Sequence, residues 1–212
     1  MKVPQWVVWD LGGVVIDLDF RGMMDDATEK FNIDKSELLP LIREEFNVSP
    51  SNYSLTEKAV AGLITKKDYI YEIKSAISSD ISEREIESLL KRILVGEKDE
   101  TVLLIKLLSQ RGFRQACMSN IDQTHWEKIQ SFPNVDNLFE KKFLSFEHKV
   151  VKPNADAFFK MLEFLGCGKD DIVFIDDRED NVKSANDNDI DAVLFKNHTK
   201  LLEDFTTRGL LN

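Results

Sequence analysis

Acidic residues, a hydroxyl group and a lysine follow short apolar runs at widely separated places in this sequence. Asp10 ends the apolar run 6–9 and is followed by Leu11 and the glycine pair Gly12–Gly13. A carboxylate in this setting could attack phosphorus and form an acyl phosphate, which divides a difficult hydrolysis into two displacements. The alternative interpretation is a turn aspartate followed by glycines that let the backbone bend sharply.

Two adjacent acids, Asp176 and Asp177, follow a second apolar run, 172–175, and Asp180–Asn181 continue the pattern. Neighbouring carboxylates repel each other, so a divalent cation is their natural partner. Mg²⁺ takes carboxylate, phosphate and water oxygens as ligands. The alternative is helix capping, because acids at the start of a helix interact favourably with its dipole whatever the function.

Two further segments supply polar groups that suit a phosphoryl group. Ser119 and Asn120 close a third apolar run, and Lys152 precedes Pro153. The Ser119 hydroxyl could donate to a phosphoryl oxygen, and the lysine could neutralise charge that spreads during phosphoryl transfer. By themselves, Ser-Asn is a common turn pair and a single lysine is usually solvated. Pro153 suits the first position of a helix.

The elements that must position these groups are short strands alternating with helices. Strands are predicted wherever an apolar run is closed by polar or glycine residues, at Gln5–Trp9, Gln115–Met118, Lys142–Leu144, Ile172–Ile175 and Ala192–Phe195. Apolar stripes from Val102 to Leu108 and from Ala157 to Leu165 predict two intervening helices. This alternation predicts an α/β fold with a doubly wound parallel sheet.

From Asp17 to about Glu97 the pattern is helical throughout. Apolar residues recur at helical spacing, as at Leu38, Ile42 and Phe46. The segments 54–57 and 82–85 match the capping box, in which a serine and a glutamate satisfy free N–H groups at a helix start. We therefore expect a helical block of about 80 residues inserted after the first strand.

The order and content of these four segments resemble the haloacid dehalogenase-like (HAD) hydrolase superfamily, over essentially the whole chain. The resemblance implies a Rossmann-like core at 1–16 and 98–212 and a helical cap at 17–97, as in relatives similar to sugar-1-phosphate phosphatases. It also implies phosphate ester hydrolysis through an aspartyl phosphate. The implied catalytic residues are Asp10, Ser119 and Lys152. Ser119, Asn120 and Lys152 would bind substrate, and Mg²⁺ would be held by Asp10, the Gly12 carbonyl, Asp177 and Asp176.

One position departs from the family's pattern. Phosphatases of this family carry a second Asp two residues after the nucleophile, where this chain has Gly12. That Asp protonates the leaving oxygen and then activates water, and such assistance is worth roughly 10²–10⁴-fold in rate. Three interpretations follow: a phosphatase of a small phosphorylated metabolite, such as a sugar phosphate; a catalytically impaired binding or regulatory protein; and a haloacid dehalogenase, which expels halide without a proton.

Composition narrows the range of partners. The 212 residues carry a formal charge of −10, which disfavours nucleic-acid binding. Acidic residues interrupt the longest apolar run, so no membrane-spanning segment is expected. Cys117 and Cys167 stand in unlike contexts, which is typical of reduced thiols, and the N-terminus has no signal-peptide pattern. We expect a cytoplasmic protein.

Overall fold

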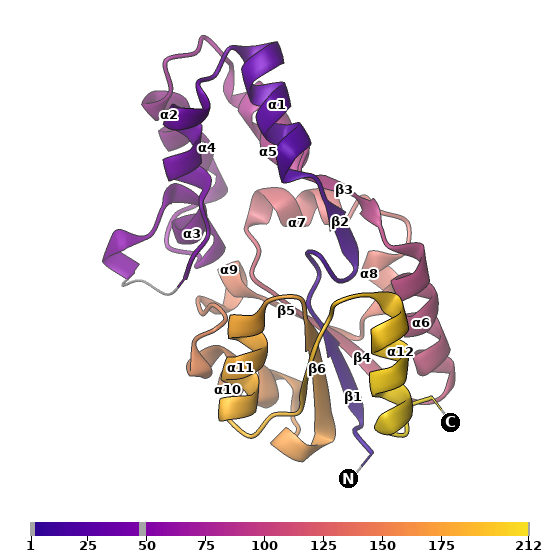
Figure 1. Ribbon diagram of the computed structural model, residues 1–212. Helices are drawn as coiled ribbons and strands as arrows, with labels where there is room; N and C mark the ends of the chain where they lie inside the picture. Colours follow the sequence, from indigo (N-terminus) through magenta and orange to yellow (C-terminus); the bar gives the residue numbers. More distant parts are fainter. Residues whose placement is uncertain (1–2, 47–49, 212) are drawn as a thin grey trace.

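The core of the protein is a parallel sheet, seen in a computed structural model that describes residues 3–46 and 50–211. Five strands pair in the order β5-β4-β1-β6-β7, and every pair is parallel (Figure 1). The strands are β1 (Trp6–Trp9), β4 (Arg114–Ser119), β5 (Lys141–Leu144), β6 (Ile172–Asp176) and β7 (Ala192–Leu194). Each lies within two residues of a predicted strand, so the predicted sheet is confirmed.

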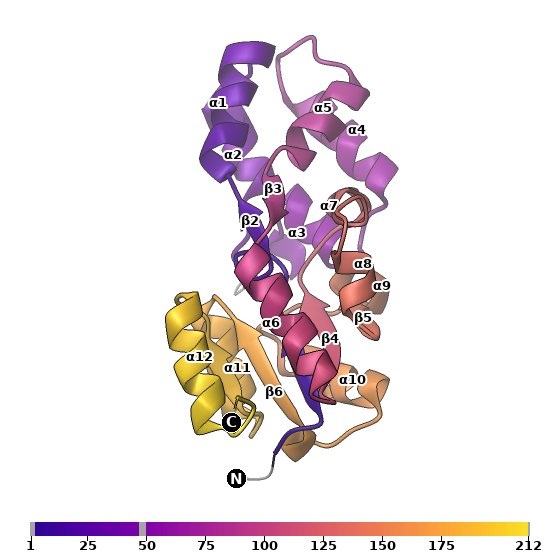
Figure 2. The same ribbon diagram turned by 90° about the vertical axis from the view of Figure 1, so that its right-hand side faces the viewer.

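Both faces of this sheet are buried, which explains why its strands are apolar throughout. Successive strand residues point to opposite faces, so Trp6 and Val8 join one apolar cluster while Val7 and Trp9 join the other. Helices α10 (Ala155–Leu165) and α11 (Glu179–Asp187) cover the first face. Helices α6 (Asp99–Gln110) and α12 (His198–Thr207) cover the second (Figure 2). This is the doubly wound arrangement expected from the sequence.

Five helices in the first half of the chain have an apolar core of their own. They are α1 (Phe20–Phe31), α2 (Lys35–Ile42), α3 (Leu55–Val60), α4 (Lys66–Ala76) and α5 (Glu83–Lys91). We call them the cap helices, because they stand beyond the end of the sheet (Figure 1). The capping boxes predicted at Ser54 and Ser82 are both present, at the starts of α3 and α5.

Two strands lie where the sequence pattern predicted only helices. β2 (Ile16–Leu18) and β3 (Leu94–Glu97) form an antiparallel pair at the two ends of the predicted helical block. Both are short and partly exposed, so neither carries the continuous apolar pattern by which the other strands were found. Their pairing brings the two crossings between sheet and cap helices side by side. The boundaries 17 and 97 for a cap domain stay a prediction.

The helix predicted through Leu38, Ile42 and Phe46 does not extend past Ile42. Helix α2 ends at Ile42, Arg43 is extended, and Phe46 has a positive φ of 51°. Helix α3 supplies the reason: the Ser54 hydroxyl donates to the Arg43 carbonyl at 2.6 Å. Tertiary hydrogen bonds therefore replace the next helical turn. The segment 43–46 becomes a short irregular strap that faces the sheet.

The remaining elements are short. Helices α7 (Gln123–Ile129), α8 (Val135–Leu138) and α9 (Ser145–His148) follow β4 and β5, and 3₁₀ turns lie at Pro50–Asn52 and Lys169–Asp171. Pro153 is not the first residue of α10 as predicted, because Asn154 caps that helix and Ala155 begins it. Both cysteines are free. Over the described residues, no helix is long and apolar enough to cross a membrane.

Candidate active site

Three adjacent strands bring the predicted residues to one edge of the sheet. β1 lies between β4 and β6, and Asp10 follows β1, while Ser119 ends β4 and Asp176 ends β6. The Asp10 amide donates to the Ile175 carbonyl at 2.8 Å, which fixes the backbone as it leaves the sheet. Ligands bind at such an edge in open α/β sheets because the strands' carboxyl ends open into a crevice there.

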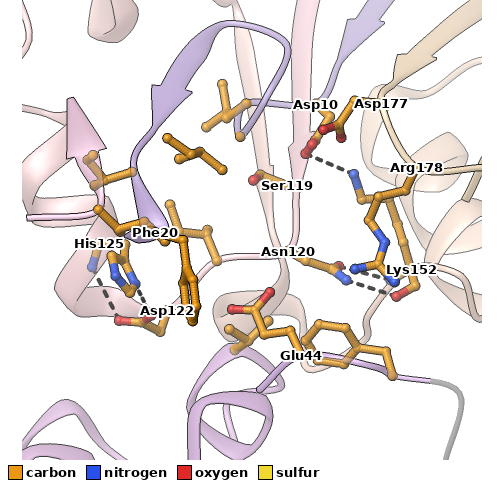
Figure 3. A pocket seen from close by; sticks show the side chains of 18 of the residues that line it. Asp10, Phe20, Glu44, Ser119, Asn120, Asp122, His125, Lys152, Asp177 and Arg178 are labelled. Atoms are coloured by element: carbon orange, nitrogen blue, oxygen red, sulfur yellow. Dashed lines mark hydrogen bonds and ion pairs between the residues drawn. The ribbon is translucent and has the colours of Figure 1, made fainter. Parts of the chain in front are cut away.

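Lys152 reaches this edge from the loop before α10, and its side chain is 1% exposed. Its ammonium group donates to Asp10 Oδ1 at 2.9 Å, to Asp176 Oδ2 at 2.6 Å and to the Met118 carbonyl at 2.9 Å. Burial disfavours the charged lysine, but Asp10 and Asp176 raise its pKa above the usual value. Lys152 is therefore a fixed positive charge beside Asp10 (Figure 3).

Asn120, which lines the cavity over these residues, makes two hydrogen bonds to the backbone of Lys152. Its amide group donates to the Lys152 carbonyl at 2.8 Å and accepts from the Lys152 N–H at 2.9 Å. These reciprocal bonds join the end of β4 to the loop that carries the lysine. The geometry supports a positioning contribution for Asn120; substrate binding by Asn120 stays a prediction.

Asp176 is completely buried and surrounded by donors. Besides the bond from Lys152, its carboxylate accepts hydrogen bonds from the Asn181 side-chain amide, at 3.0 Å to each oxygen. It also accepts from the backbone N–H of Arg178 at 2.9 Å. Buried carboxylates require such partners because water no longer solvates them. Asp176 thus orients the lysine and ties β6 to the start of α11.

Three carboxylates could hold a metal ion. Asp10, Asp176 and Asp177 each present an oxygen, and these oxygens lie within 4.8 Å of one another. Burial and the neighbouring acids raise the pKa of Asp10, against the opposing effect of Lys152. Burial and Asp176 also raise the pKa of Asp177. A divalent cation would relieve this repulsion, and an all-oxygen set suits Mg²⁺.

The two glycines after Asp10 differ in what they do. Gly13 has a φ of +74°, and a Cβ there would lie 2.1 Å from Asp177 Oδ2. Only glycine therefore lets the Asp177 carboxylate approach the loop after β1. Gly12 lines the cavity beside Asp10, and a Cβ there would meet the Leu18 side chain at 3.3 Å. The predicted use of the Gly12 carbonyl as a metal ligand stays a prediction.

A cavity of about 510 Å³ opens over these residues. Its floor contains Asp10, Ser119, Lys152 and Asp177, and Ser119 itself is buried. The walls are mostly apolar and come from the cap helices, from β2 and β3, and from α7. Apolar wall residues include Leu18, Phe20, Ile42, Phe46, Val60, Ile93, Leu94 and Ile129. The cap helices thus cover the edge of the sheet that carries the predicted residues.

Five charged residues in the cavity were not found from the sequence: Arg43, Glu44, Asp122, His125 and Arg178. His125 Nδ1 pairs with Asp122, and its Nε2 lies 3.1 Å from the Leu90 carbonyl. Burial opposes the charged imidazole, yet Asp122 and Glu44 raise the pKa of His125 to about 9. One signal could have located this pair, because Asp122 caps α7 and a histidine follows three residues later. Nothing in the run 43–46 distinguished Glu44 from its neighbour.

A sequence model of the haloacid dehalogenase-like hydrolases matches residues 4–189. The chain belongs to this family.

Solved structures with the same fold include a HAD family enzyme from Bacteroides thetaiotaomicron in complex with magnesium and inorganic phosphate. It is 22% identical, has a TM-score of 0.79, and the match covers 93% of this chain and 98% of that one. A HAD-like family hydrolase from Porphyromonas gingivalis is 20% identical with a TM-score of 0.79, over 97% and 98% of the two chains. An L-2-haloacid dehalogenase from Xanthobacter autotrophicus is more distant, at 13% identity and a TM-score of 0.62, over 96% and 83%.

One curated relative is the drimenol cyclase drtB of Aspergillus calidoustus. It is 26% identical over 190 residues, which covers 89% of this chain but 33% of the cyclase. The chain therefore spans about a third of the length of that relative.

Proposed function

We propose that this protein is a Mg²⁺-dependent phosphatase that hydrolyses a small phosphorylated metabolite through an aspartyl phosphate on Asp10. The observation that carries the proposal is the convergence of Asp10, Lys152 and the Asp176–Asp177 pair at the floor of one cavity. These groups come from segments far apart in the chain, and together they supply a nucleophile, a fixed cation and oxygen ligands.

In the proposed reaction an Asp10 oxygen attacks phosphorus while the bond from phosphorus to the leaving oxygen breaks. Lys152 and the Ser119 hydroxyl hold phosphoryl oxygens and offset the charge that develops on them. Water then attacks the acyl phosphate, releases inorganic phosphate and restores the Asp10 carboxylate. Covering the cavity keeps bulk water away during the first displacement, and product leaves when the cap helices move.

The acidic cluster fits a magnesium site. Asp10 and Asp177, with the Gly12 carbonyl and with Asp176 alongside, would hold the ion. When bound, Mg²⁺ would neutralise phosphate charge and so allow an anionic nucleophile to approach an anionic substrate. The Bacteroides enzyme of the same fold holds magnesium and phosphate, which supports the assignment of this ion.

The shape of the cavity bears on the leaving group. Its volume of about 510 Å³ suits a metabolite, and pockets of a few hundred Å³ are typical of small-molecule sites. Ile42, Phe46 and Val60 line it from the side of the cap helices. We infer a phosphate monoester whose leaving group has an apolar portion; a sugar phosphate remains the second substrate class to be tested.

Two other functions are open to the same fold. A dehalogenase would not need a proton donor, which suits Gly12, but the family's dehalogenases use no metal and the three clustered carboxylates favour one. A binding or regulatory protein would need neither a nucleophile nor a lysine held at 2.9 Å from it. Both are therefore less well supported than a phosphatase.

The proposal is tested by phosphate release from alkyl phosphates of increasing chain length, sugar phosphates, an acyl phosphate and an aryl phosphate. Wild type and Asp10→Asn are compared with Mg²⁺ and with a chelator. We expect turnover that needs both Asp10 and Mg²⁺, and a kcat/KM that rises with alkyl chain length. Folded wild-type protein that releases no phosphate from any member would refute the phosphatase and favour the binding protein.

A further inference from the structure

The strap 43–46 places one acidic side chain over the candidate site. Glu44 lines the same cavity as Asp10 and Lys152, and its carboxylate points into that cavity (Figure 3). Among the residues that the structure describes, none makes a hydrogen bond or an ion pair with this carboxylate. It is therefore available to a bound molecule.

The backbone on both sides of Glu44 is hydrogen-bonded to Glu57 of α3 and to Ser54, the residue that caps this helix. The Glu57 carboxylate, which is 0% exposed, accepts from the backbone N–H of Glu45 at 2.7 Å and of Phe46 at 2.9 Å. The Ser54 hydroxyl donates to the Arg43 carbonyl at 2.6 Å. Residues on both sides of Glu44 are thus fixed, so its side chain enters the cavity from a defined position.

On the described floor of the cavity, Asp10 and Asp177 are assigned to the nucleophile and the metal ion and Ser119 to a phosphoryl oxygen, so none of them is left to protonate the leaving oxygen. Gly12 stands where the family's phosphatases carry their acid, and it has no side chain. Lys152 is occupied by two carboxylates and a carbonyl, and the imidazole of His125 contacts Asp122 and the Leu90 carbonyl. Among the described residues that line the cavity on the side of the cap helices, Glu44 is the carboxyl group that makes no hydrogen bond or ion pair.

The structure assigns Glu44 as the general acid and base of this site, in place of the residue missing at Gly12. This inference rests on the proposed phosphatase function. As the bond between phosphorus and the leaving oxygen breaks, the Glu44 carboxyl proton moves to that oxygen. The resulting carboxylate then accepts a proton from the water that attacks the acyl phosphate. Glu44 is thereby protonated again, and Asp10 is again a free carboxylate.

The electrostatic surroundings of Glu44 suit this exchange. Glu44 is accessible from the open cavity, but desolvation by the surrounding protein raises the pKa of its carboxyl group to about 7. The charged groups that face it are His125 and Arg178, which lower the pKa, and Asp122 and Glu57, which raise it. An acid with a pKa close to the working pH is present in both protonation states, which favours proton transfer in either direction.

The test measures the first turnover of Glu44→Gln on substrates with different leaving groups. An alkyl phosphate has a poor leaving group that needs a proton, whereas nitrophenyl phosphate has a good one. We expect phosphorylation of Asp10 by the alkyl phosphate to slow by roughly 10²-fold or more, and the nitrophenolate burst to change little. With Mg²⁺ at saturation, so that Asp10 is ionised throughout, the wild-type rate with the alkyl phosphate should fall as the pH rises through about 7, because Glu44 loses its proton. Glu44→Gln should lose this dependence.

Glu45→Gln is the matched control, because Glu45 is the same residue type one position along and does not line the cavity. Thermal unfolding shows whether each variant is folded. Equal losses on both substrates, a change in KM alone, or no change in Glu44→Gln would overturn the assignment while leaving the phosphatase intact. An inactive wild type would instead contradict the phosphatase, and the Glu44 assignment with it.

Discussion

The Lys152 ammonium group lies between Asp10 and Asp176 and is almost completely buried. Removing it in Lys152→Met would leave two buried carboxylates without their cation, and breaking a buried ion pair costs about 3–5 kcal/mol. We expect the free energy of unfolding to fall by about that amount at neutral pH without Mg²⁺, as measured in urea, and turnover to be lost. Lys160→Met, at an exposed position of α10, should change neither; an equally stable Lys152→Met would contradict this account of the site.

Gly13 and Gly166 allow a matched comparison of backbone strain and side-chain collision. Both have positive φ values, 74° and 73°, but a Cβ at Gly166 meets no atom within 4 Å whereas one at Gly13 meets Asp177. Each substitution by alanine should cost about 1–2 kcal/mol of stability through the strained backbone. Gly13→Ala should also weaken Mg²⁺ binding at least tenfold by calorimetry, because Asp177 must move. Equal Mg²⁺ affinity in the two variants would exclude Asp177 from the metal site.

At this scale the sequence identified the floor of the site but not its walls. Asp10, Ser119 and Asp176 could be found because each ends an apolar strand, and strand ends converge at one edge of a parallel sheet. Glu44 could not be found, because its place depends on hydrogen bonds that its neighbours make to Glu57 in α3 and to Ser54, which caps that helix. Side-chain contacts between helices leave no periodic signal in the sequence.

Among the secondary-structure elements, the buried strands were predictable from the sequence and the ends of the helices were not. All five parallel strands were predicted because burial on both faces demands continuous apolar residues, and the capping boxes located the starts of α3 and α5. The ends of helices were less predictable. The stripe through Phe46 predicts a longer α2. Hydrogen bonds to Glu57 of α3 and to its N-cap, Ser54, instead hold the chain after Ile42 in an irregular conformation.

Helix α3 holds the strap through Glu57, which leads to a prediction about that helix. In Glu57→Ala three backbone N–H groups, of Glu45, Phe46 and Ser54, lose their acceptor. An unsatisfied buried donor costs about 1–3 kcal/mol, so we expect a loss of at least about 3 kcal/mol in urea denaturation. The loss should shrink at low pH, because hydrogen bonds lower the pKa of Glu57 against the effect of burial, and its stabilisation disappears as the carboxylate is protonated.

Glu85→Ala is the control for that prediction. Glu85 occupies the same position of a capping box in α5, but it is exposed and bonds only Ser82. We expect a much smaller loss of stability for Glu85→Ala, because water can satisfy the exposed Ser82 N–H when the carboxylate is removed. Similar costs for the two variants would show that the strap is not held by Glu57.

For the molecule as a whole, Mg²⁺ should act as a stabilising ligand whose effect depends on pH. At 100 times its Kd, a ligand that binds only the folded state adds about 2.7 kcal/mol, and each kcal/mol raises Tm by about 2–4 °C in a protein of this size. Burial and neighbouring acids raise the pKa of Asp10 above 3.8, so the metal-free folded state holds this proton more tightly than the unfolded chain does.

The sign of the pH effect follows from that shift. The stability that Asp10 contributes without metal is greatest below pH 3.8 and is lost as the pH rises toward the raised pKa. Mg²⁺ needs the ionised carboxylate, so the Mg²⁺-induced rise in Tm should grow over the same range. Differential scanning calorimetry from acidic to slightly alkaline pH checks this; a rise that does not depend on pH would place the ion away from Asp10.

In the proposed mechanism Asp10 carries the phosphoryl group during turnover. Acid quenching in the steady state, followed by borohydride reduction and peptide mapping, reduces an aspartyl phosphate and marks the residue that bore it. With Mg²⁺ and a substrate that the protein hydrolyses, we expect modification at position 10 alone, and none in chelator. Phosphate release with Asp10 unmodified, or with another residue marked, would contradict it.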